Sequence, residues 1–148
     1  MASLETIVNR FRGTDRNTRL EMLLDLSDRL PPLPERFQAA RDQGVNRVTE
    51  CQTPVFLFGE LVDGAFQLYA DVPREAPTVR GFVALLLKGL AGAKPEEVAA
   101  IPSDLLDRLE LTETLGMTRM QGLSAVVQRV KRMAANLTAS KVKGEGAI

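Results

Sequence analysis

Two amphipathic patterns open the chain. Apolar residues recur at helical spacing between residues 4 and 11, and again between residues 20 and 30. The second helix must end before Pro31-Pro32, because proline cannot continue a helix. After an extended connector, residues 35–42 indicate a further short helical segment, which Gly44 ends.

A pair of strand-like runs follows. Residues 55–62 and 65–70 are rich in β-branched, aromatic and other apolar residues, and they flank the dipeptide Asp63-Gly64. Asp-Gly suits a two-residue type I′ turn, whose twist matches that of the strands on either side. The sequence therefore predicts a β-hairpin here.

The short turn also predicts the register of the hairpin. If the two residues that flank the turn pair with each other, Phe56 lies opposite Asp71. Continued beyond the strands, the same register directs Cys51 towards Ala76, at the start of the next predicted helix. We therefore expect the cysteine at the open end of the hairpin.

The second half of the chain is helical in pattern. Helices are predicted at residues 79–90, 95–100 and 103–109, and from residue 118 onwards after a loop around Gly116. Pro77 suits the first position of the first of these helices, and Thr118 with Gln121 forms a capping box for the last. Residues 141–148 carry two glycines and no periodic pattern.

These elements predict a single α+β domain. We expect it to span residues 1–138, with helices covering a small antiparallel sheet in the order α-α-β-β-α-α-α-α, and a disordered tail at residues 139–148. A chain of 148 residues of which 45% are apolar is long enough for one core and short for two.

Charge and hydropathy narrow the classes of partner. Lys plus Arg and Asp plus Glu number 19 each, so the chain has no net field that would attract nucleic acid or an anionic membrane. No apolar run approaches the roughly 20 residues that a membrane span needs, and polar residues interrupt the amino-terminal segment. We expect a cytoplasmic protein with a protein or small-molecule partner.

The chain has one cysteine and no histidine. One cysteine excludes an internal disulfide and argues against a self-contained zinc or iron–sulfur site, so we expect no resident cofactor. Without histidine, the Cys–His pair of cysteine hydrolases cannot be assembled within the chain. Whatever chemistry the thiol performs therefore takes place without imidazole.

Cys51 has polar neighbours on both sides. A lone cysteine is commonly a small buried hydrophobe, but Glu50, Gln52 and Pro54 indicate an exposed or half-exposed loop. The Glu50 carboxylate disfavours a neighbouring thiolate, so reactivity would need a helix amino terminus or nearby cations. Arg47, Arg74 and Arg80 are the candidate cations.

Arg119 is the second residue that the pattern singles out. It falls in the first turn of the last predicted helix, where a positive charge opposes the helix dipole by a few tenths of a kcal/mol to about 1 kcal/mol. A charge placed against the helix dipole without visible gain is a hint of function. The physics of the sequence alone, however, favours a solvated arginine whose cost is negligible.

Three segments resemble the SufE/CsdE family of sulfur acceptors. They are Val48-Thr-Glu-Cys-Gln-Thr-Pro-Val55, preceded by a proline-containing connector, Arg74-Glu-Ala-Pro-Thr-Val-Arg-Gly81, and Leu115-Gly-Met-Thr-Arg-Met-Gln-Gly-Leu123. The family patterns are V-x-G-C-x-S-x-V-W, D-S-D-A-x-I-V-K/R-G and L-x-x-S-R-x-x-G-L. The resemblance covers roughly residues 4 to 137 and implies a fold shared with iron–sulfur scaffold proteins.

The resemblance implies a role for particular residues. Cys51 corresponds to the persulfide carrier, and Arg119 to the arginine of the third motif. Glu75 stands at the second aspartate of the middle motif, and Arg80 at its Lys/Arg. Glu50 replaces the glycine before the cysteine, a departure that could stiffen the loop and retune the thiol.

The implied function is sulfur transfer. A pyridoxal-phosphate-dependent cysteine desulfurase would supply persulfide sulfur to Cys51, and an Fe–S scaffold complex would receive it. The chain would act as a transferase-like carrier and desulfurase activator, with Arg119, Glu75, Arg80, Glu50 and Gln52 supporting the thiol or contacting the partner. The alternative is a non-catalytic adaptor that binds a desulfurase or scaffold, with Cys51 incidental.

Overall fold

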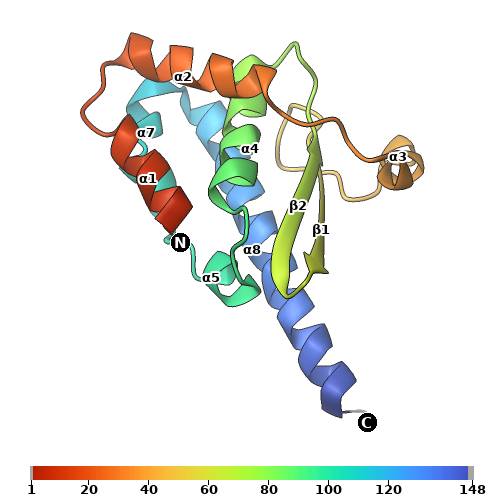
Figure 1. The fold of residues 1–148 in the computed structure, drawn as a ribbon. Coiled ribbons are helices and arrows are strands. Elements are labelled where there is room, and N and C mark those ends of the chain that lie inside the picture. Colours follow the sequence, from red (N-terminus) through yellow and green to blue (C-terminus); the bar gives the residue numbers. More distant parts are fainter. Residues whose placement is uncertain (1, 147–148) are drawn as a thin grey trace.

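The computed structural model describes the backbone of residues 2–146 and the side chains of residues 3–139. Its elements are α1 (Ala2–Phe11), α2 (Arg16–Asp28), α3 (Glu35–Asp42), β1 (Phe56–Val62), β2 (Ala65–Asp71), α4 (Pro77–Gly89), α5 (Pro95–Ala99), α6 (Leu105–Arg108), α7 (Leu111–Thr114) and α8 (Met117–Gly146) (Figure 1). The predicted α+β class with a helix-covered hairpin is confirmed. The element order contains two helices more than the predicted one. One is α3, which was predicted as a helical segment but left out of that order, and the other is the short α7 before Gly116.

The hairpin has the predicted register. β1 and β2 form a two-stranded antiparallel sheet in which Phe56 pairs with Asp71 and Val62 with Ala65. Asp63 and Gly64 both have positive φ, at 53° and 81°, as a type I′ turn requires. The turn residues therefore set the pairing along the whole hairpin.

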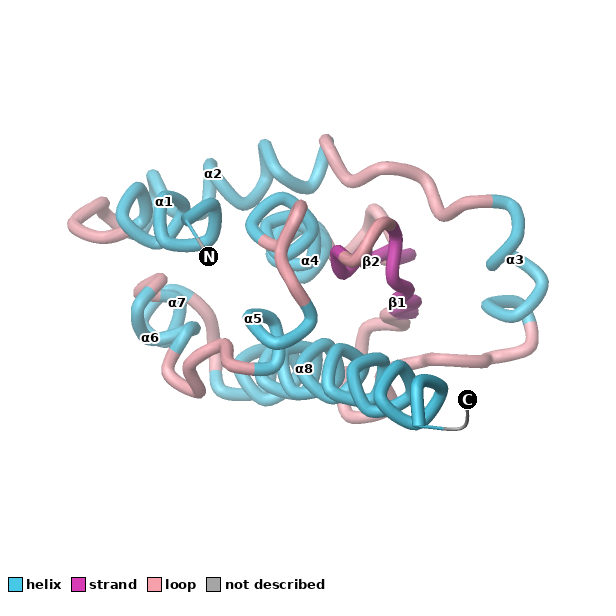
Figure 2. Tube along the Cα trace, turned by 60° about the horizontal axis from the view of Figure 1, so that its bottom comes forward, coloured by secondary structure: helices cyan, strands magenta, loops and turns pink. Residues whose placement is uncertain are grey.

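Helix α4 occupies the centre of the molecule. Every residue from Val79 to Leu86 is buried, because the helix is covered on several sides at once. Figure 2 shows α4 surrounded by α1 and α2, by β2 and by α8. A helix with apolar side chains around its whole circumference is typical of the core, because on the surface one side would expose them to water.

The contact between α2 and α4 is unusually close. A Cβ atom placed on Gly81 of α4 would lie 2.1 Å from the backbone oxygen of Leu23 in α2. Beside it, the buried Arg80 donates from Nε to the Ser27 carbonyl at 2.9 Å and from Nη1 to the Val72 carbonyl at 2.5 Å. These two residues join α4 to the end of α2 and to the segment that follows β2.

The last helix differs from its prediction at its start. α8 begins at Met117, so Thr118 is already inside the helix and the predicted capping box is wrong. The predicted tail, residues 139–148, overlaps α8, which continues to Gly146; residues 147–148 lie outside the described residues, and disorder of the tail stays a prediction. Within the described residues, none of the helices combines the length and the apolarity that a membrane crossing requires.

Candidate functional site

Residues 48–55 form a closed loop with Cys51 near its tip, which we call the Cys51 loop. At its base, Val48 donates its backbone N–H to the Val55 carbonyl at 2.8 Å, and Arg47 pairs with Phe56 as an isolated bridge. Both valines are fully buried, so the base is anchored in the core. The hairpin ladder ends at the pair Phe56–Asp71, and residues 48–55 close on themselves instead of extending the strand. That Cys51 lies towards Ala76 stays a prediction.

Cys51 is buried, which corrects the predicted exposed or half-exposed position. Its relative exposure is 5%, although Glu50 and Gln52 on either side are exposed. The Cys51 backbone N–H donates to the Val48 carbonyl at 3.2 Å, which turns the chain at this point. The polar neighbours correctly indicated that the segment is exposed. The Cys51 side chain nevertheless belongs to the hydrophobic core cluster.

The thiol rests on Gly122 of α8. A Cβ atom on Gly122 would lie 2.9 Å from Cys51 Sγ and 3.5 Å from its Cα, so the loop needs a residue without a side chain at this point. Glycine inside a helix costs about 1 kcal/mol relative to alanine, and the close approach of the loop explains its presence. Gly122 belongs to the motif Leu115–Leu123, but no role was predicted for it. The available signal was a glycine within a helical pattern.

Glu50 links the Cys51 loop to α8 by charge. Its carboxylate accepts a hydrogen bond from the Thr49 hydroxyl at 2.8 Å and lies 3.9 Å from the Arg129 guanidinium. The Thr49 hydroxyl, the backbone N–H of Glu50 itself and the charges of Arg129 and Arg132 hold the pKa of Glu50 below its ordinary value. Glu50 is thus an anion at neutral pH.

Arg119 is exposed in the first turn of α8, one helical turn before Gly122. Within the described residues its side chain makes no hydrogen bond or ion pair. Glu75, in the segment between β2 and α4, is exposed, as is Gln52 in the Cys51 loop. These three side chains are open to a partner.

Arg80 does not belong to this exposed set. The prediction that it stabilises the thiol or contacts a partner is corrected, because the side chain is 9% exposed and donates to two backbone carbonyls. Guanidinium groups are held in this way where they join elements of the fold. Arg80 therefore has a structural role.

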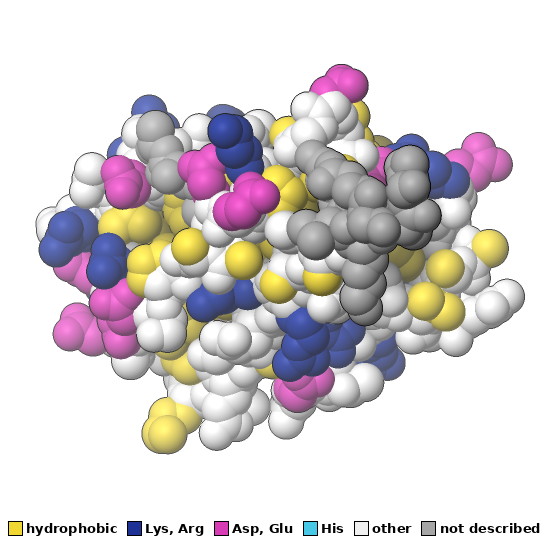
Figure 3. All heavy atoms as spheres, turned by 90° about the horizontal axis from the view of Figure 1, so that it is seen from below, with side chains coloured by type: hydrophobic (Ala, Val, Ile, Leu, Met, Phe, Trp, Pro, Cys, Tyr) yellow, Lys and Arg dark blue, Asp and Glu magenta, His cyan; other side chains and the backbone are white. Residues whose placement is uncertain are grey.

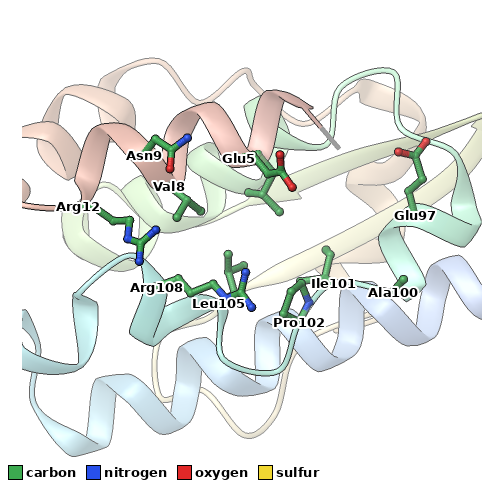
Figure 4. A pocket seen from close by; sticks show the side chains of 11 residues that line it. Glu5, Val8, Asn9, Arg12, Glu97, Ala100, Ile101, Pro102, Leu105 and Arg108 are labelled. Atoms are coloured by element: carbon green, nitrogen blue, oxygen red, sulfur yellow. The ribbon is translucent and has the colours of Figure 1, made fainter.

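A separate groove of about 560 Å³ lies between α1 and the α5–α6 region (Figure 4). Leu4, Val8 and Ile101 contribute to its apolar floor, while Arg12 and Arg108 lie towards one end. The charged side chains of this lining are exposed. Neither the Cys51 loop nor α8 contributes to the groove, and no pattern in the sequence indicated it.

Within the described residues, no group of three or more Cys, His, Asp or Glu side chains could hold a metal ion. The chemistry that the site offers is that of one thiol, covered at rest, beside a helix that carries arginines. In this position the thiol is shielded from a reacting partner, because Sγ is in contact with that helix and the residue is only 5% exposed.

The chain is similar to known proteins over most of its length. The family model SufE, described as an Fe-S metabolism associated domain, matches residues 5–134. An uncharacterized SufE-like protein of Mycobacterium tuberculosis is 33% identical over 132 residues, covering 88% of this chain and 90% of the relative. The sulfur acceptor protein CsdE of Escherichia coli is 30% identical over 129 residues, covering 85% of this chain and 84% of the relative.

A solved structure supports the same relationship. The solution structure of a hypothetical protein from Thermus thermophilus superposes with a TM-score of 0.79 at 32% sequence identity. The match covers 93% of this chain and 96% of the other. The family-model match, over residues 5–134, spans the Cys51 loop and the first turns of α8.

Proposed function

The chain belongs to the SufE family, and we propose that it is a sulfur acceptor that carries persulfide sulfur on Cys51 in Fe–S metabolism. The observation that carries the proposal is the placement of the one cysteine of the chain near the tip of a loop anchored at its base. A carrier thiol must reach a partner's active site, and a loop tip can do so while the domain stays folded.

In the proposed reaction a cysteine desulfurase presents a cysteine persulfide made with its own pyridoxal phosphate. The Cys51 thiolate attacks the outer sulfur, a new S–S bond forms, and the donor's S–S bond breaks. The donor cysteine leaves as a thiolate, and Cys51 becomes a persulfide. Because the sulfur moves at an unchanged oxidation level, the step needs no external oxidant or reductant.

The same step raises the turnover of the desulfurase. Removal of the persulfide frees its cysteine for the next turnover, so the chain stimulates the enzyme by accepting its product. Cys51 then delivers the sulfur to an Fe–S scaffold complex by a second exchange of the same kind. The chain is in this sense a transferase-like carrier.

Exposed side chains near the loop have a proposed role in docking. Arg119 places a positive charge one turn before Gly122, beside the position that Cys51 leaves when the loop opens. Glu75 and Gln52 are exposed and supply further polar contacts to the donor. Glu50 differs from these side chains, because at rest it already has a partner in Arg129.

One observation favours a second candidate function. Cys51 is only 5% exposed, as expected of a cysteine that merely fills space in a core. In that case the chain is an adaptor that binds a desulfurase or scaffold protein without accepting sulfur.

Intact-mass measurement separates the two candidates. After incubation with a cysteine desulfurase and free cysteine, the carrier gains the mass of one sulfur atom, and reduction removes it. The Cys51→Ser variant gains nothing, because serine cannot form a persulfide. Desulfurase binding without an adduct on the native chain, or an adduct that survives in Cys51→Ser, overturns the carrier proposal.

A further inference from the structure

Two arginines follow Gly122 on α8, the first on the face that the Cys51 loop covers and the second about 80° round the helix from Gly122. Arg129 lies two turns further along the helix, and with 3.6 residues per turn it projects in nearly the same direction as Gly122. Arg132 follows after another turn and is exposed, whereas the Arg129 side chain is 24% exposed. We call Arg129 and Arg132 the α8 arginine pair.

This pair is a local concentration of charge in a chain with no net charge. Figure 3 shows a compact group of Lys and Arg side chains, with an acidic side chain at its edge, on the face that bears the carboxyl-terminal end of α8. Like charges so close together repel one another unless a counter-charge is present. Local charge of this kind acts over about 8–10 Å at physiological salt, so it recognises partners in contact rather than at a distance.

Glu50 supplies the counter-charge at rest. It is the carboxylate in an ion pair with Arg129, and at 3.9 Å between nitrogen and oxygen the pair is longer than a hydrogen bond. The Glu50 side chain remains 57% exposed. Such a pair is weak and exchangeable, because water and salt screen it.

Movement of the loop must separate these charges. Glu50 precedes Cys51 directly, so a loop that withdraws Cys51 from Gly122 also withdraws Glu50 from the α8 arginine pair. The pair is then left without its carboxylate while the donor is close by. A carboxylate on the donor can take the vacated place.

We propose that the α8 arginine pair is a docking surface for a carboxylate-bearing face of the sulfur donor, and that Glu50 occupies this surface while the Cys51 loop is closed. The proposal rests on the sulfur-acceptor function. The donor's carboxylates bind the open state better than the closed one, so docking shifts the loop towards the open state. Glu50 thereby makes release of the thiol dependent on a partner with acidic groups.

The resting half of the proposal is tested on the isolated chain. Cys51 is labelled with a neutral alkylating reagent in the native chain and in Glu50→Gln, Arg129→Gln and the double variant. The alkylation rates are compared at the pH above which each variant's rate no longer rises, where all of the thiol is thiolate. A difference in thiol pKa is then not mistaken for opening of the loop. Lys131→Gln is the control, because Lys131 lies on the same helix at about 180° from Gly122.

We expect each single variant to be labelled faster than the native chain by roughly two- to fivefold, the range for an exposed ion pair. The double variant should be no faster than the faster single variant, because both changes remove one interaction. Labelling of Lys131→Gln should match the native chain. Native rates in Glu50→Gln, or an equal increase in Lys131→Gln, overturn this half of the proposal.

The docking half is tested by titration with a cysteine desulfurase. Arg129→Gln/Arg132→Gln should bind the desulfurase roughly three- to tenfold more weakly than the native chain and with a smaller dependence on salt. Lys131→Gln should bind as the native chain does. Native affinity in the double variant overturns the docking surface even if sulfur still reaches Cys51, whereas absence of sulfur on a native chain that binds normally overturns the sulfur-acceptor function instead.

Discussion

Gly81 and Gly122 are two glycines inside helices, and each is approached by another segment too closely for a Cβ atom. At Gly81 the neighbour is the backbone oxygen of Leu23, at 2.1 Å from the position of such an atom. At Gly122 it is the sulfur of Cys51, at 2.9 Å. Leu23 lies within a helix whose hydrogen bonds hold it, whereas Cys51 lies in a loop anchored only at its base. The first contact belongs to the permanent fold, and the second is one that the proposed function must break.

The arginines near these two glycines also differ, one being buried and the other exposed. Arg80, next to Gly81, is buried and donates to the carbonyls of Ser27 and Val72. Arg119, one turn before Gly122, is exposed and makes no side-chain hydrogen bond within the described residues. One arginine is used by the fold, and the other remains open to a partner.

The largest effect is expected for Gly81→Ala. The added methyl group collides with a backbone carbonyl that cannot move without displacing α2, so the free energy of unfolding should fall by about 3 kcal/mol, the upper end of the range for overpacking. For a domain of this size, that loss lowers Tm by roughly 6–12 °C. Urea unfolding followed by circular dichroism measures it.

Gly89→Ala is the matched control, in the same helix. Its methyl group would meet the Cδ1 atom of Leu4 at 2.9 Å, the flexible end of a side chain, so the change should be within about 1 kcal/mol. If Gly81→Ala is as stable as Gly89→Ala, the α2–α4 contact is not rigid.

A smaller loss is expected for Arg80→Met. Methionine keeps much of the apolar stem but provides no donor, so the Ser27 and Val72 carbonyls lose their partner in a buried place. The free energy of unfolding should fall by about 2 kcal/mol, again measured by urea unfolding. Arg119→Met, the exposed counterpart, should change it by less than about 0.5 kcal/mol. Equal losses in the two variants would remove the distinction between the two arginines.

The hairpin was predictable from sequence because its determinants are local. Asp63-Gly64 admits one compact turn, and a two-residue turn leaves a single register, which places Phe56 opposite Asp71. Pro77 likewise marked the start of α4. The short α7 was missed, because a helix of four residues has too few positions to show a period.

The burial of Cys51 could not be predicted in the same way. Its neighbours in sequence are exposed, and the residue that covers its sulfur is Gly122, far along the chain. Exposure of a loop side chain depends on which distant element packs against it, and a single sequence does not contain that pairing. Arg80 was misassigned for the same reason, since its acceptors lie in α2 and after β2.

A small effect on stability, but the clearest effect on the thiol, is expected for Gly122→Ala. Alanine regains about 1 kcal/mol of helix propensity, and this gain offsets much of the cost of moving Cys51 Sγ. The free energy of unfolding should therefore change by less than about 1 kcal/mol. The Cys51 loop should nevertheless leave α8, because it can yield where the α2 backbone cannot, and alkylation of Cys51 by a neutral reagent should become faster.

Gly116→Ala supplies the comparison, since a Cβ atom there meets nothing within 4 Å, and its rate of alkylation should equal that of the native chain. A variant of Gly122 that is labelled slowly and unfolds as easily as Gly81→Ala would show that the two contacts are alike, and that the loop is part of the fixed core. Fast labelling at nearly native stability would instead show that the fold is independent of the Cys51–Gly122 contact. That independence is what a carrier requires, because its thiol must leave its buried position against α8 at each transfer while α2, α4 and the hairpin remain in place.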